Sequence, residues 1–91
     1  MNEEITVLPD TYLLDGTHGT YEVKVARATY GDYKPLYYPL TPCCDATGKG
    51  SMTAYGDGIV VCRSCHHEVD DAFGDCWDGD DEFTSRGPKP V

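Results

Sequence analysis

The sequence predicts a small α+β domain, built of antiparallel β-hairpins with one helix near its C-terminal end. The first observation is a series of short runs rich in Val, Leu and Tyr, separated by Gly, Pro and Asp turns, over residues 5–61. The second is a run with helical spacing after residue 65. The third is a pair of cysteine clusters on either side of one expected hairpin, because such clusters stabilise small domains by binding a metal ion.

The strand signals before the cysteines alternate with turn residues. The expected strands cover residues 5–8, 12–14 and 20–30, followed by an extended segment at 36–38 between two prolines. In the longest strand, the inward-facing parity of the apolar residues switches between Val25 and Ala26. A β-bulge explains this switch, and the alternative is that the small alanines face solvent. Residues 51–55 and 59–61 then form the hairpin between the cysteine clusters.

The cysteines predict a structural zinc site. Cys62 and Cys65 form a CxxC turn, from which two sulfurs reach one ion, and Cys43 with Cys44 supplies the second pair. Disulfides are disfavoured because a reducing compartment is expected and a total of five cysteines leaves one unpaired. A ligand turn, a hairpin and a second ligand pair at the start of a helix is the order found in zinc-ribbon and treble-clef folds.

The ligand set leaves two alternatives open. Neighbouring residues of a strand point to opposite sides, so Cys43 and Cys44 both bind one ion only where the chain is tightly turned. Should one of them be excluded, His66 or His67 is the nearest substitute. An iron–sulfur cluster that recruits Cys76 is the second alternative, although the spacing favours Cys76 as a buried apolar residue.

The period changes from two to 3.6 after Cys65. One apolar stripe runs through Val69, Ala72, Phe73, Cys76 and Trp77, which predicts a helix from Glu68 to Asp78. Beyond Gly79, acids together with Gly and Pro predict a disordered tail. The expected organisation is therefore a zinc-stabilised domain at 1–79 and an acidic disordered tail at 80–91.

One segment carries a family resemblance. Residues 42–69 resemble small zinc-ribbon-like proteins common in actinobacteria and their phages. The resemblance rests on the cysteine pair in 42–50, the CxxC strand end in 58–65 and the following Glu68-Val69. The resemblance implies a metal-binding fold and a phage or phage-like origin. It implies no activity, because members of the family mostly lack one. The family has an aromatic residue after the CxxC, where this chain has His66.

The charge is negative and uneven. Eight of the sixteen acidic residues lie in 68–91 against two bases, so this segment carries most of the net charge of −9. Such a field repels the phosphate backbone of nucleic acids and favours a basic protein surface. The start of the chain, Met1 to Glu4, is acidic where a secretory signal is basic, and no apolar run reaches membrane-spanning length. The expected location is the cytoplasm, which is the host cytoplasm for a phage-encoded chain.

Composition and motifs favour a binding protein over an enzyme. A closed site of four thiolates has no open position for water, and no nucleophile stands with a base in a readable motif. We therefore expect a non-enzymatic zinc-binding protein that acts through protein–protein interaction, as a phage-encoded modulator of a host protein with a basic surface.

Two other function classes remain. A nucleic-acid-binding or transcription-linked zinc module would use the bases that precede the acidic segment, which are Lys24, Arg27, Lys34, Lys49 and Arg63. A virion or assembly component is the third class, and oligomerisation distinguishes it.

Overall fold

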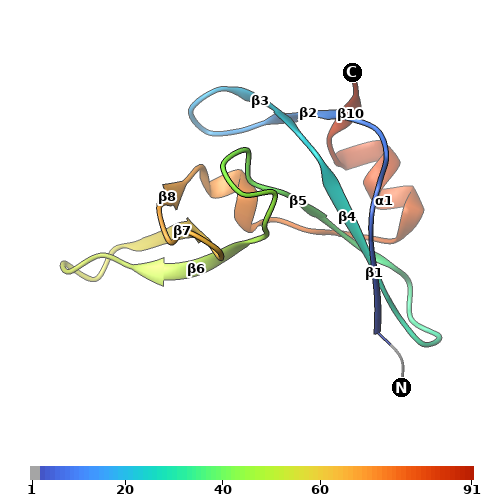
Figure 1. The fold of residues 1–91 in the computed structure, drawn as a ribbon, viewed down its shortest axis with the longest axis horizontal. Helices are drawn as coiled ribbons and strands as arrows, with labels where there is room; N and C mark the ends of the chain where they lie inside the picture. Colours follow the sequence, from blue (N-terminus) through green and yellow to red (C-terminus); the bar gives the residue numbers. More distant parts are fainter. Residues whose placement is uncertain (1–2) are drawn as a thin grey trace.

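Antiparallel sheets and one α-helix make up the computed structural model, which describes residues 3–91 (Figure 1). Met1 and Asn2, which begin the acidic start and the predicted domain, lie outside the described residues. The strands are β1 Glu3–Val7, β2 Tyr12–Asp15, β3 Thr20–Val23, β4 Val25–Tyr30, β5 Leu36–Pro39, β6 Gly48–Met52, β7 Gly58–Cys62, β8 Glu68–Val69, β9 Trp77–Asp78 and β10 Lys89–Pro90. The α-helix is α1, Gly79–Arg86, and a 3-10 turn, η1, covers Asp71–Gly74. The predicted α+β class with antiparallel strands is confirmed.

The predicted strand at 20–30 is divided between two sheets. Its first part, β3, pairs with β2 in the sheet β10-β2-β3, and its second part, β4, lies between β1 and β5 in the sheet β1-β4-β5-β9. Val23 and Val25 both enter the core, whereas Ala26 is buried on the opposite face of β4, so the inward-facing parity does not switch at Val25. The predicted β-bulge is wrong, because the ladders of β3 and β4 keep a constant register and the chain instead changes sheet at Lys24. The alternative that the alanines face solvent is wrong, because Ala26 and Ala28 are both buried.

The third sheet, β6-β7-β8, contains the predicted hairpin between the cysteine clusters. Its ladder runs from Gly48↔Cys62 to Met52↔Gly58, so β6 begins earlier in the sequence than expected. Figure 1 shows this hairpin reaching away from the other two sheets. The short β8 pairs with the other side of β7, at Val60↔Val69.

The helix predicted from Glu68 to Asp78 is wrong. This segment forms β8, then η1, then β9, which pairs with β5. The carboxylate of Asp70 accepts a hydrogen bond from the N–H of Ala72, which caps the 3-10 turn. Spacings of three and four residues suit a turn followed by a strand as well as a helix, and Phe73 and Trp77 are buried as predicted. Cys76, expected to be buried, is exposed.

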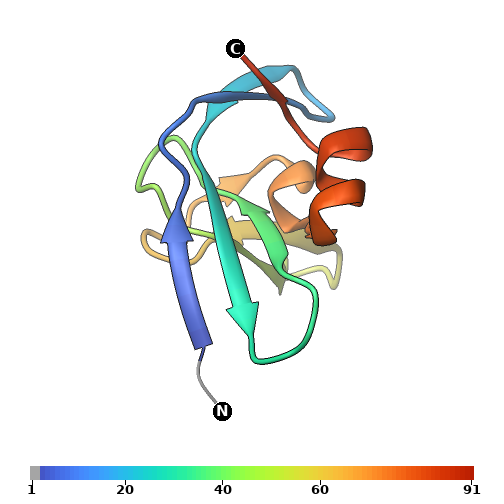
Figure 2. The ribbon, with the colours of Figure 1, turned by 90° about the vertical axis from the view of Figure 1, so that its right-hand side faces the viewer.

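Residues 80–91, predicted as a disordered tail, form most of α1 and all of β10. Phe83 holds the helix in place, since its ring stacks on Tyr37 at 4.2 Å between centroids and meets Tyr12 edge-on at 5.5 Å. Figure 2 shows α1 beside β5, against which it packs. The prediction failed because acids with Gly and Pro suggest disorder, whereas one buried aromatic residue anchors this segment. No helix in the described part of the chain is long and apolar enough to cross a membrane.

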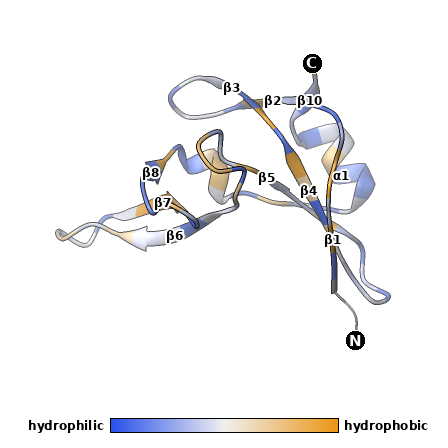
Figure 3. Cartoon of the chain, in the orientation of Figure 1, coloured by the Kyte–Doolittle hydropathy of each residue, from blue (hydrophilic) through white to orange (hydrophobic). Residues whose placement is uncertain are grey.

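The core consists of side chains from the β10-β2-β3 and β1-β4-β5-β9 sheets, from η1 and from α1. Its buried residues are Tyr12, Leu14, Val23, Val25, Tyr37, Ala72, Phe73, Trp77 and Phe83. Figure 3 shows hydrophobic residues along β4, whereas most of α1 is hydrophilic. The acidic C-terminal segment is therefore attached to the core through a few apolar side chains.

Replacing Phe83 with alanine tests this attachment. Because Phe83 is 9% exposed and contacts two other aromatic rings, we expect Phe83→Ala to lower the free energy of unfolding by about 3–5 kcal/mol. Urea denaturation followed by circular dichroism measures the change. Ser85→Ala, on the exposed side of α1, is the matched control. An unchanged midpoint for Phe83→Ala would mean that residues 80–91 do not pack on the core.

Candidate metal centre

Four cysteine sulfurs meet at the base of the β6–β7 hairpin. The Sγ atoms of Cys43, Cys44, Cys62 and Cys65 all lie within 4.8 Å of one another. Cys62 ends β7 and is fully buried, Cys65 is partly buried, and Cys43 with Cys44 is exposed. The predicted cysteines are thus brought together in an arrangement that could hold a metal ion.

Two turns of the same form present these sulfurs. The N–H of Asp45 donates to the carbonyl of Thr41 at 2.8 Å, and the N–H of His66 donates to the carbonyl of Cys62 at 2.9 Å. In each turn the donor has left-handed backbone, with φ of 49° at Asp45 and 63° at His66. Because the turn from Thr41 to Asp45 is this tight, the adjacent Cys43 and Cys44 can both direct their sulfurs at the same site.

Backbone hydrogen bonds lock the two turns to each other. The N–H of Arg63 in the second turn donates to the carbonyl of Thr47 at 2.9 Å and so connects the two turns. The N–H of Thr41 donates to the carbonyl of Ala46 at 2.7 Å and closes the first turn. The ladder pair Gly48↔Cys62 follows directly. In the folded chain, main-chain hydrogen bonds therefore set the relative position of the two cysteine pairs.

The alternative ligands are not part of this group. Among residues 3–91, the close set of possible metal ligands consists of the four cysteines, without His66, His67 or Cys76. Both histidines are exposed. The backbone of His67 contributes instead, because its carbonyl accepts the N–H of Cys62 at 2.8 Å.

Thr41 is a polar neighbour of the sulfurs that the sequence analysis missed. Its side chain is fully buried, and its Oγ1 lies 3.3 Å from the Sγ of Cys62 and 3.4 Å from the Sγ of Cys43. The Oγ1 also accepts the N–H of Ala46 at 3.4 Å. Its position two residues before Cys43 was the available signal, but threonine is common in such turns and carries no distinctive spacing.

The thiols have unequal proton affinities. The N–H of Cys65 and then the hydroxyl of Thr41 lower the pKa of Cys62 to about 6. Hydrogen bonding first to Cys65 and then to Cys43 raises the pKa of Cys44 to about 12. Four sulfurs this close cannot all be anionic without a cation among them, so a metal ion must displace protons to bind.

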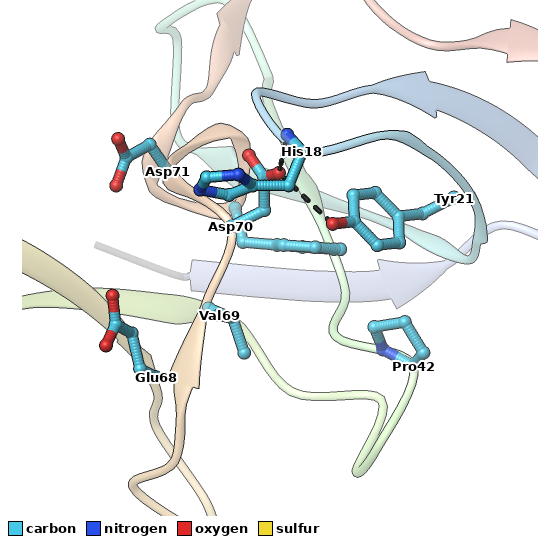
Figure 4. Close-up of a pocket in the computed structure, with 8 residues that line it drawn as sticks. His18, Tyr21, Pro42, Glu68, Val69, Asp70 and Asp71 are labelled. Carbon is cyan, nitrogen blue, oxygen red and sulfur yellow. Dashed lines mark hydrogen bonds between the residues drawn. The ribbon is translucent and has the colours of Figure 1, made fainter.

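A second concave region surrounds Asp70. A cleft of about 430 Å³ is lined by residues that include His18, Tyr21, Glu68 and Asp70, and Figure 4 shows Tyr21 directed at the Asp70 carboxylate. That carboxylate accepts hydrogen bonds from the N–H groups of Thr17 at 2.8 Å and His18 at 2.7 Å, and from the Tyr21 hydroxyl at 3.2 Å.

These bonds make Asp70 a structural anchor. The hydrogen bond from the N–H of Ala72 lowers the pKa of this carboxyl most. Burial raises the pKa, but together with the other donors this bond holds it well below its usual range. The turn before β3 approaches so closely that a Cβ on Gly16 would lie 2.7 Å from Asp70 Oδ2. Asp70 therefore joins the β2–β3 turn to the segment between β8 and η1, and it is not a free surface acid as the charge pattern suggested.

Comparison of the chain with protein-family models, with curated proteins and with solved structures finds no match. The site must therefore be interpreted from its own geometry.

Thr41 provides a test of how the sulfurs are held. Thr41→Val keeps the shape of the side chain but removes the hydroxyl between Cys62 and Cys43, so we expect metal affinity to fall about 10- to 100-fold, as for other outer partners of metal ligands. Competition with a chromophoric chelator measures this. Thr41→Ser retains the hydroxyl and should keep most of the affinity. Equal affinities for the valine and serine variants would contradict a role for this hydrogen bond.

Proposed function

We propose that this chain is a non-enzymatic zinc-binding protein with a zinc-ribbon-like metal centre, and that it acts by binding another protein. A treble-clef-like centre is less well supported, because β8 and not a helix follows the second cysteine pair. The observation that carries the metal assignment is the convergence of the four Sγ atoms within 4.8 Å. An all-sulfur, four-ligand set suits tetrahedral zinc, and two short turns separated by a hairpin are typical of structural zinc sites. In this proposal, Cys43, Cys44, Cys62 and Cys65 hold the ion.

The proposed role of the zinc is structural. Four thiolates complete the coordination of zinc and leave no position for a substrate or water. The buried carboxylate of Asp70 already accepts four hydrogen bonds. These features support a binding protein over an enzyme.

The acidic C-terminal segment supports a basic partner. The acidic surface, as we use the term, consists of the exposed Asp75, Asp78 and Asp81. In the part of the chain that the structure describes, the ion pair shorter than 4.0 Å is Arg86 with Glu82 at 3.9 Å, so these three carboxylates are not neutralised internally. Asp78 and Asp81 line one small cleft of about 220 Å³ at the start of α1. Asp81 lies on α1, Asp78 ends β9 and Asp75 follows η1. Ordered elements thus present this charge in a fixed arrangement, which favours specific recognition of a basic surface.

Neutralisation of the acidic surface tests this proposal. The triple variant Asp75→Asn, Asp78→Asn and Asp81→Asn should lose proteins that the wild type captures from a lysate of the host at low salt, where charge interactions are strongest. Asp70 stays intact because it is structural, and Asp80 stays because it accepts the Tyr37 hydroxyl. The matched control neutralises three distant exposed acids, with Glu4→Gln, Asp10→Asn and Glu22→Gln. The same captured proteins with both triple variants would refute the acidic surface as the binding site.

Residues 42–69 resemble phage proteins, so the partner that we propose is a protein of the host. Its basic surface is the property that the capture experiment selects.

The nucleic-acid alternative is less well supported, because the net charge of −9 repels a phosphate backbone. Three of the five bases before the acidic segment also make contacts within the chain, although they keep their charge. Lys24 Nζ donates to the carbonyl of Pro9 at 3.1 Å, Arg27 lies 5.9 Å from the centre of the Tyr37 ring, and Arg63 Nε donates to Thr47 Oγ1 at 3.1 Å. Salt-dependent DNA or RNA binding in a mobility-shift assay would favour that alternative instead.

A further inference from the structure

We propose that copies of this chain associate head to tail, with the tip of the β6–β7 hairpin of one copy seated in an apolar hollow on the sheet of the next. The hairpin tip is the segment 52–57. The apolar hollow, about 340 Å³ in volume, is lined by Ile5, Ala26, Ala28, Tyr30 and Tyr38 together with Arg63 and Thr47. This inference goes beyond the proposed function and does not use the acidic surface.

The hairpin tip exposes large apolar side chains. Tyr55 is 94% exposed and Met52 is 70% exposed, and Figure 1 shows the hairpin extending away from the rest of the chain. Tyrosine and methionine are enriched at protein interfaces, where they supply much of the contact area. Their position at the end of a protrusion suits insertion into a concave surface.

The hairpin tip is also preorganised. Thr53 Oγ1 accepts the N–H groups of Tyr55 at 3.3 Å and Asp57 at 3.2 Å, while the N–H of Thr53 donates to the carbonyl of Asp57 at 2.9 Å. Gly56 takes a φ of 87°, which permits the turn that these bonds close. A loop held in this way loses little conformational entropy when Tyr55 is buried by another molecule.

The apolar hollow lies on the face of the β1-β4-β5 sheet opposite to the core. Side chains alternate along β4 and β5, so Val25 and Tyr37 enter the core while Ala26, Ala28 and Tyr38 face the hollow. The alanines give it a shallow floor between larger neighbours. Ile5 stands beside it and remains 61% exposed, so apolar surface is available to a visiting side chain.

A hairpin tip cannot fill the hollow of its own molecule. Thr47 and Arg63, which line the hollow, adjoin the Gly48↔Cys62 pair at the base of the hairpin, whereas the tip follows Met52↔Gly58 at the other end. At about 3.4 Å per residue, this ladder separates the two by well over 10 Å. The tip must therefore enter a second copy, and a contact between two different surfaces continues head to tail.

Charge complementarity selects this occupant. Arg63 is the cationic residue among those that line the hollow, and the hairpin tip carries the exposed Asp57. The net charge of −9 opposes association between copies at long range, so the contact should be weak. Salt screens this long-range repulsion more than the attraction of one close pair, so the contact should strengthen as salt is added.

Complementation between two variants tests the proposal. At about 0.5 M salt, sedimentation equilibrium of the zinc-loaded wild type should show an average mass that rises with concentration from 10.0 kDa to at least twice that value. Tyr55→Ser removes the tip anchor and Ile5→Glu places a charge beside the hollow, so each variant alone should remain a monomer. Both sites are exposed, and circular dichroism verifies that each variant is folded. An equimolar mixture should form dimers that do not grow further, because one intact tip meets one intact hollow.

Three results would overturn the proposal. A wild type that stays monomeric at millimolar concentration would exclude association between copies through the tip and the hollow. Association of Tyr55→Ser with itself would indicate another contact, such as edge pairing through β1. A mixture of the two variants that remains monomeric, while the wild type associates, would exclude a tip-to-hollow contact.

Discussion

Removal of the proposed zinc ion is expected to unfold the β6-β7-β8 sheet and to lower the melting temperature of the whole chain by more than about 15 °C. Structural zinc contributes on the order of 10 kcal/mol in small domains, which is comparable to their total stability. This sheet adds little to the core: its buried side chains are Val61 and Cys62, and Val60 and Val69 are only partly buried against the core cluster. Circular dichroism melts with and without a chelator measure the effect.

Cysteine variants identify the ligands in the same experiment. Cys62→Ser should abolish one-to-one zinc binding, measured by elemental analysis, because Cys62 is the fully buried member of the cluster. Cys76→Ser should retain zinc and the wild-type melting temperature, since Cys76 is exposed and outside the cluster. A coloured preparation, or loss of metal from Cys76→Ser, would contradict the zinc assignment and favour an iron–sulfur cluster.

The convergence of the four cysteines could be predicted because the sequence signals for it are local. CxxC and an adjacent cysteine pair each specify a short turn, and the hairpin between them fixes how the two turns meet. Thr41 escaped prediction because its role depends on burial beside Cys62, which the sequence pattern does not reveal. The resemblance of residues 42–69 also implies a phage or phage-like origin of the chain, which the structure does not test.

The C-terminal third was harder to predict because its structure depends on distant contacts. The stripe from Val69 to Trp77 fits a helix by spacing, yet Asp70 receives its donors from the β2–β3 turn and the chain is held there in a different form. Likewise, α1 exists because Phe83 reaches Tyr12 and Tyr37, which are far away in sequence. Periodicity and composition identified the buried residues better than the elements that bury them.

Replacement of Asp70 by asparagine is expected to cause a large loss of stability, although it nearly preserves the shape of the side chain. Asparagine has nearly the same shape, but it lacks the negative charge, and its NH₂ group would face the N–H donors of Thr17, His18 or Ala72. A buried network left partly unsatisfied is strongly destabilising. We expect the melting temperature to fall by about 10 °C or more, whereas the exposed neighbour variant Asp71→Asn should change it little.

The pH dependence of this difference distinguishes the carboxylate from a general effect of substitution. Because folding lowers the pKa of Asp70, mainly through the N–H of Ala72, its contribution to stability is complete above the pKa of an unfolded aspartate, about 3.9. It is lost as the pH falls below that value, so the gap in melting temperature between wild type and Asp70→Asn should narrow in acid. Tyr21→Phe removes one donor, and a double-mutant cycle with Asp70→Asn should show coupling. Additive effects and a gap that is constant with pH would show that the carboxylate does not join the β2–β3 turn to η1.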